Sequence, residues 1–179
     1  EKKFKLEGRS LIAAEVLKKF MNRILDYDKA YAPFRIIGLE ASSREGYSLE
    51  VPVEVEGEKK AIRIKGIIDR LDMKERKVRV IDYKTGRDAK DFSTIISLTD
   101  RDDNARNKAV FQVMFYSYLF MKKYQESYET IEPGIFNSRD LFDESFEWKV
   151  SSRWKVKGEK DDVEARGMNA KIVDHVVIG

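Results

Sequence analysis

The chain of 179 residues carries 35 basic and 32 acidic side chains, and its net charge of +3 is too small to indicate nucleic-acid binding by itself. Hydrophobic residues make up 42% and charged residues 37%, which is typical of a globular domain and excludes a disordered chain. The chain has no cysteine, which excludes internal disulfides and iron–sulfur clusters, and no apolar run approaches the about 20 residues of a membrane-spanning helix.

We therefore expect a single domain over residues 1–179, in a cytoplasmic setting and without a membrane partner. Its first residue is Glu1 and its last residues form an apolar run. Both features suggest that the domain is part of a longer polypeptide.

The first half of the chain predicts one helix followed by strands. Apolar residues at helical spacing predict a helix over 11–25, with Ser10 as its N-cap. Strands are predicted over 35–40, 47–55, 61–71 and 78–84. The polar segments 56–58 and 73–77 between the last three of them read as turns, so we expect three or four consecutive antiparallel strands.

The second half predicts a long loop and a buried helix. Residues 87–106 are polar and poorly periodic, which favours a loop with at most one helical turn. Residues 108–124 are apolar over most of the helical circumference, so we expect this helix to be mostly buried. A short strand over 135–137 and a final helix from Asp162 complete the order. This order predicts an α/β domain with a central mixed sheet flanked by helices.

Two acidic side chains interrupt otherwise apolar strands. Asp69 follows Ile67 and Ile68, and Asp82 lies two positions before Lys84 at the end of the strand VRVIDYKTG. Alternation along the strand puts Asp82 and Lys84 on one face. The turn between the two strands lets them pair, which can bring the two carboxylates side by side.

Adjacent carboxylates repel each other, and a divalent cation removes that conflict. Mg²⁺ prefers oxygen ligands from one or two carboxylates and keeps several waters, and the carbonyl of Tyr83 would also face such a site. Lys84 could then orient an attacking water or stabilise charge on a phosphate oxygen. Glu40 either completes the metal shell or is the solvated end of a strand. The simpler alternative for Asp82 and Lys84 is an ordinary ion pair.

A polar stripe runs along the predicted buried helix. Gln112 and Tyr116 lie four positions apart and therefore one above the other, and Lys108 extends the stripe by one turn. These side chains could bind the substrate backbone, hold Lys84 in position, or form a helix edge half in water.

The segments GIIDRLD, VRVIDYKTG and QVMFY, in that order, resemble the RecB-type branch of the PD-(D/E)XK nuclease superfamily. That branch includes the nuclease domains of RecBCD- and AddAB-type helicase–nucleases and many phage exonucleases. The resemblance implies a restriction-endonuclease-like fold, dependence on Mg²⁺ or Mn²⁺, and DNA as substrate. It assigns metal binding to Asp69 and Asp82, catalysis to Lys84, and the family's helix motif to Gln112 and Tyr116. Glu40 matches an acidic position upstream in many members.

The sequence departs from this pattern in two respects. RecB-type members usually carry a metal-ligating histidine on a helix before the first strand, whereas the only histidine here is His175. Some relatives also hold an iron–sulfur cluster through flanking cysteines, and this chain has no cysteine. Separately, the chain has no phosphate-binding GxxxxGK[ST] loop, so a helicase motor would lie on another segment or on a partner subunit.

Two functions remain open at this point. One is a metal-dependent DNA exonuclease domain acting in recombination or repair, and the other is a DNA-binding or scaffolding module that kept the fold without cutting. Asp72 is expected to be a turn residue, and Arg70 either reaches a phosphate or pairs with a carboxylate. The basic residues of the long loop either contact DNA or are solvated. They are Lys90, Arg101, Arg106 and Lys108.

Overall fold

Four strands form the central sheet of the computed structural model, in the order β1-β4-β5-β7. The model describes residues 7–42, 44, 46–102, 106–124 and 128–152. The sheet strands are β1 (Arg35–Ala41), β4 (Ile68–Lys74), β5 (Lys77–Lys84) and β7 (Thr130–Asn137). β4 pairs antiparallel with β1 and β5, whereas β5 and β7 are parallel, so the sheet is mixed.

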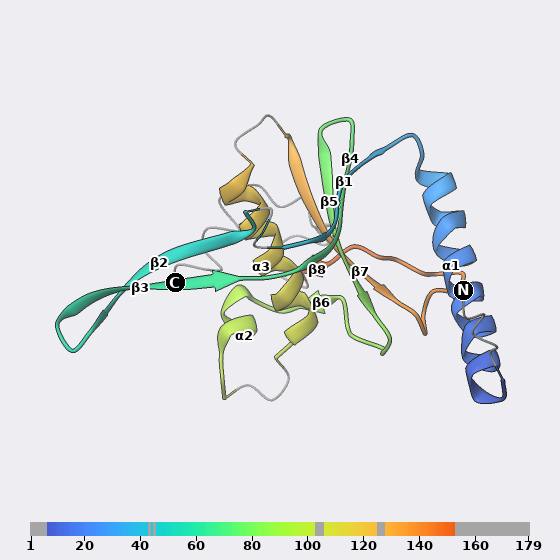
Figure 1. Ribbon diagram of the computed structural model, residues 1–179, viewed down its shortest axis with the longest axis horizontal. Helices are drawn as coiled ribbons and strands as arrows, with labels where there is room; N and C mark the ends of the chain where they lie inside the picture. The colour runs from blue at the N-terminus through green and yellow to red at the C-terminus, as the bar shows by residue number, and fades with distance from the viewer. Residues whose placement is uncertain (1–6, 43, 45, 103–105, 125–127, 153–179) are drawn as a thin grey trace, which may run out of the picture.

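Helices α1 (Arg9–Tyr31) and α3 (Lys108–Lys123) lie on opposite sides of this sheet (Figure 1). The predicted class, α/β with a central mixed sheet flanked by helices, is confirmed. It agrees with a restriction-endonuclease-like fold. None of the helices in the described ranges is long and apolar enough to span a lipid bilayer.

The core on the α3 side is built from the apolar circumference of this helix. Asn107 caps the helix by accepting a hydrogen bond from the Val110 amide at 3.1 Å. The side chains of α3 that become buried are mostly apolar, and each large one stabilises the fold by about 1.5–3 kcal/mol. They are Ala109, Val110, Val113, Met114, Ser117, Tyr118, Leu119 and Phe120. The prediction of a mostly buried helix is confirmed.

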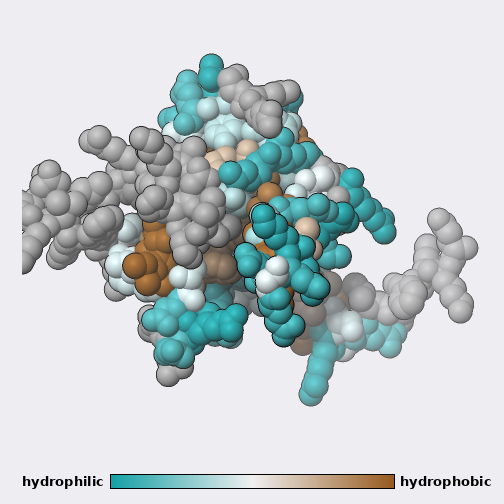
Figure 2. Space-filling view, turned by 90° about the vertical axis from the view of Figure 1, so that its left-hand side faces the viewer, coloured by the Kyte–Doolittle hydropathy of each residue, from teal (hydrophilic) through white to brown (hydrophobic). Residues whose placement is uncertain are grey.

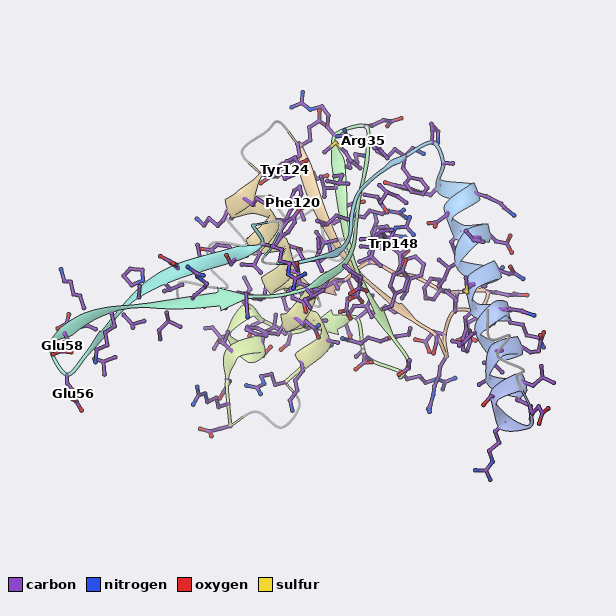
Figure 3. All side chains as sticks on the ribbon, in the orientation of Figure 1. Arg35, Glu56, Glu58, Phe120, Tyr124 and Trp148 are labelled. Carbon is purple, nitrogen blue, oxygen red and sulfur yellow. The ribbon has the colours of Figure 1, made fainter. Side chains whose placement is uncertain are left out.

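Helix α1 covers the other face of the sheet and is longer than the predicted 11–25. Its contacts come from its second half, where Phe20, Ile24 and Tyr27 pack against a small core. That core includes Ile81 of β5, and Trp148 lies between the sheet and the helix (Figure 3). The apolar side chains of its first half remain exposed, and no residue of α1 is fully buried.

The hairpin of β2 (Ser48–Val55) and β3 (Glu58–Lys65) leaves the body of the molecule (Figure 1). Glu56 and Glu58 lie at its tip (Figure 3), and the surface seen from this side carries both hydrophilic and hydrophobic patches (Figure 2). The predicted continuous strand over 61–71 is wrong, because the chain leaves β3 at Lys65 and enters the central sheet only at Ile68. The intervening Gly66 passes so close to Tyr116 that no side chain fits there without movement.

The segment between β5 and α3 contains two short elements, β6 (Asp91–Phe92) and α2 (Ile95–Thr99). Strand β6 pairs with β8 (Ser151–Ser152), and a capping box at Thr94 starts α2. Strand β7 begins five residues before the predicted 135–137 and includes Pro133, which its position at the sheet edge permits. The final helix predicted from Asp162, and His175, lie outside the described residues.

Candidate active site

The ends of β4 and β5 place Asp69 and Asp82 beside each other. Arg70 pairs with Ile81 across the two strands, and continuing this antiparallel register by one residue sets Asp69 opposite Asp82. Directly opposite residues project from the same face of a sheet. Asp69 Oδ2 also accepts a hydrogen bond from the backbone N–H of Tyr83 at 2.8 Å. Both acids therefore belong to one site, on the α3 side of the sheet.

Helix α3 supplies the second half of the site. Lys84 Nζ lies 2.7 Å from Asp82 Oδ2 and donates to Gln112 Oε1 at 2.9 Å. Gln112 Nε2 donates to Asp82 Oδ1 at 3.1 Å and to the hydroxyl of Tyr116 at 2.8 Å. One amide thus holds both charged partners, and Tyr116 fixes that amide. Among the three interpretations of the stripe, this geometry favours positioning of Lys84.

Burial and neighbouring charges act on the carboxyl group of Asp82. Its residue is 1% exposed, and burial raises the pKa of its carboxyl group. Lys84 opposes this shift, whereas the negative charges of Asp69 and Asp88 add to it. Oδ2 forms an ion pair with the Lys84 ammonium at 2.7 Å, so Lys84 is its charged partner among the described residues. A buried carboxylate with a second acid beside it is suited to bind a divalent cation, because the cation removes the repulsion between the two negative charges.

A sequence model of the PD-(D/E)XK nuclease superfamily matches residues 4–175, which is nearly the whole chain. The chain belongs to this superfamily. A comparison with curated proteins finds no significant match. Superfamily membership indicates a nuclease, with DNA as substrate and a divalent metal ion as the usual cofactor.

The acids of this PD-(D/E)XK chain fit a hard divalent cation. Asp69 and Asp82 offer carboxylate oxygens, and no cysteine or histidine competes among the described residues. Within the described ranges, no three acidic or histidine side chains gather into a metal cluster. A pair of carboxylates can hold a divalent metal ion that keeps several of its waters.

Glu40 lies in the neighbouring strand but does not join the pair. The register of β1 with β4 sets Glu40 beside Asp69, between the pairs Leu39–Arg70 and Ala41–Ile68. Its φ of 49° lies in the left-handed region, so its side chain does not follow the regular alternation of the strand. It is exposed, and its contribution to a metal shell stays a prediction.

Two other sequence predictions are decided by the contacts. Asp72 is not a turn residue, since it lies inside β4 at 0% exposure. The prediction was wrong because two arginines neutralise this carboxylate and let the strand continue to Lys74. Arg70 is one of the two, and it pairs with carboxylates instead of being free for a phosphate.

The basic residues of the long loop fall into different environments. Lys90 is engaged, because its ammonium donates to the carbonyl of Glu147 at 2.6 Å. Arg101 is exposed. Arg106 and Lys108 line a cavity of about 510 Å³ at the start of α3.

Proposed function

We propose that this chain is a RecB-type, metal-dependent DNA exonuclease domain that acts in recombination or repair. The observation that carries the proposal is that Asp82, Lys84 and Gln112 contact one another pairwise. Asp69 lies directly across the strand pair from Asp82. A structural ion pair between Asp82 and Lys84 would not need a second, half-buried carboxylate of the same charge beside it.

Each residue of the set has a distinct part in the proposed reaction. Asp69 and Asp82 would hold Mg²⁺ or Mn²⁺, which acts as a Lewis acid and stabilises negative charge on the phosphate when bound. Lys84 provides a fixed positive charge that orients the attacking water or stabilises a phosphate oxygen. Gln112 keeps the ammonium within reach of the phosphate, and Tyr116 keeps the amide from rotating.

The cavity at the start of α3 gives the substrate backbone a place beside this site. Lys108 lies one helical turn before Gln112, so the cavity and the catalytic set share one face of the helix. Arg87 and Arg106 add positive charge to the cavity, which Asp88 and Asp91 partly offset, and two serines add hydroxyl groups. Phosphate oxygens of DNA bind such groups, and binding of this kind weakens as salt rises.

The proposal is tested with linear and covalently closed circular DNA, incubated with the protein and Mg²⁺ or Mn²⁺. We expect digestion of linear DNA from its ends, and no cleavage of the circle. Asp82→Asn and Lys84→Ala should each abolish digestion. Lys60→Ala is the matched control, because this exposed lysine lies on the hairpin and forms an ion pair with the exposed Glu58.

The possible outcomes separate the candidate functions. Cleavage of closed circles would replace the exonuclease with an endonuclease. DNA binding without any cutting, under both metal ions, would instead support the alternative of a DNA-binding or scaffolding module in a helicase–nuclease complex. Equal digestion by Lys84→Ala and wild type would refute the assignment of the site.

A further inference from the structure

A second network of charged side chains occupies the face of the sheet opposite the active site. Arg70 forms a bidentate ion pair with Asp28 of α1, with N–O distances of 2.8 and 2.9 Å. Its Nε also donates to Asp72 at 2.8 Å. Arg79 donates to both oxygens of Asp72 at 2.7 and 2.9 Å. These two arginines and two aspartates thus form one connected ion network with no net charge.

The side chains of this network are almost completely buried. The exposed fractions of the side chains are 5% for Arg70, 0% for Asp72 and 2% for Arg79, and Asp28 retains 15%. Removing four charges from water is costly, and apolar residues of similar volume are often as stabilising as a buried ion network. Stability alone therefore gives a weak reason for this arrangement, whereas fixed geometry gives a stronger one.

Tyr83 connects the network to the active site. Arg70 Nη1 donates to the hydroxyl of Tyr83 at 3.2 Å, and the backbone N–H of Tyr83 donates to Asp69 Oδ2 at 2.8 Å. Arg70 directly follows Asp69 in the chain, and Tyr83 directly follows Asp82. Each metal-binding acid is therefore adjacent to a residue that the network holds on the opposite face.

We propose that Asp28, Arg70 and Tyr83 are positioning residues that set the orientation of the Asp69 and Asp82 carboxylates. Docking of α1 onto the sheet then determines how well the site binds a divalent cation. This inference rests on the proposed function, in which the two acids hold the metal.

The test measures Mn²⁺ binding to the whole chain by isothermal titration calorimetry, for wild type and for Asp28→Asn and Tyr83→Phe. Loss of a group that orients metal ligands commonly weakens metal affinity 10- to 100-fold. We expect a loss in that range for Asp28→Asn and a smaller loss for Tyr83→Phe, which keeps the ring. Asp26→Asn is the matched control, because Asp26 lies on the same helix and forms an exposed ion pair with Lys29.

A nuclease assay over a range of Mn²⁺ concentrations adds a second readout. The positioning role predicts a higher Mn²⁺ concentration for half-maximal activity, with a nearly unchanged maximal rate at saturating metal. Urea unfolding without metal identifies a variant that fails to fold. If Asp28→Asn does so, the mild variant Tyr83→Phe decides the question.

The results also distinguish this inference from the proposed function. If wild type binds Mn²⁺, Asp82→Asn abolishes binding, and Asp28→Asn and Tyr83→Phe both bind as tightly as wild type, the positioning role is refuted and the metal site stands. If wild type binds no Mn²⁺, or Asp82→Asn binds as wild type does, the proposed metal site itself fails.

Discussion

Gly66→Ala tests why the segment GIIDRLD begins with glycine. A Cβ at this position would lie 2.5 Å from Cε1 and 3.0 Å from Cδ1 of Tyr116, and 3.4 Å from Cδ1 of Leu119. Overpacking of this kind costs about 1–3 kcal/mol. Alanine also restricts the unfolded chain, which offsets about 0.4–1 kcal/mol. We expect a net loss of roughly 1–2 kcal/mol in the free energy of unfolding.

Urea unfolding of a double-mutant cycle isolates the clash from other effects. In the background Tyr116→Ala the ring is gone, and Gly66→Ala should then be neutral or stabilising by up to about 1 kcal/mol. Tyr116 also holds Gln112, so Gly66→Ala should slow DNA cleavage under conditions where the variant stays folded. An equal cost of Gly66→Ala in both backgrounds would refute the reasoning, because the cost would then not come from Tyr116.

Three further predictions concern stability. Burial raises the folded-state pKa of Asp82 above its unfolded value, so its ionised form destabilises the fold at high pH, and this cost disappears as pH falls toward the unfolded pKa of about 3.9. Metal-free Asp82→Asn should therefore be more stable than metal-free wild type at pH 8, and the two should be equally stable near pH 4. Urea unfolding in which the variant is more stable by the same amount at both pH values would contradict this. The turn between β4 and β5 holds Glu75 and Arg76 at φ of 49° and 66°. Replacement of this pair by Asn-Gly should raise the free energy of unfolding by about 0.5–1 kcal/mol. An unchanged midpoint of urea unfolding would argue against strain in this turn. Arg79→Met leaves Asp72 buried with one partner fewer and should cost about 3–5 kcal/mol in thermal or urea unfolding, and a cost below 1 kcal/mol would show that the network relaxes freely.

The strand pair that carries both acids could be predicted from local sequence alone. Alternation gives the face of each side chain, and a short polar turn leaves few possible registers between consecutive antiparallel strands. Asp69 and Asp82 are 13 positions apart and meet through that turn. The contact of Gln112 with Lys84 was one of three interpretations of the polar stripe, and the sequence could not choose among them, because no local pattern specifies where a helix docks on a sheet.

The pairing of Asp28 with Arg70 could not be predicted in the same way. These residues are 42 positions apart, and the contact depends on how α1 crosses the sheet. The sequence does contain a signal, since Asp72 and Arg79 are charged residues flanked by apolar residues inside predicted or observed strand segments. Charges are depleted at such positions unless they are paired, so each pointed to a partner without naming it.

The parallel pairing of β5 with β7 also lay beyond local reasoning. A parallel partner requires a crossover connection, here the segment with β6, α2 and α3. The sequence showed the helix and the last strand but not the edge of the sheet to which the chain returns. The expected run of antiparallel strands is therefore correct for β1, β4 and β5 and incomplete for the sheet as a whole.

The two faces of the β4–β5 pair depend on a single register. A slip by one residue would turn the side chains of one strand to the wrong face, and Asp82 would no longer oppose Asp69. The same slip would separate Asp72 from Arg79, which are direct cross-strand partners, and leave charges buried without a counterion. That penalty amounts to about 3–5 kcal/mol for one broken buried pair, which is a large share of the stability of a typical domain. The ion network on the α1 side therefore selects the register that brings the two acids together on the α3 side.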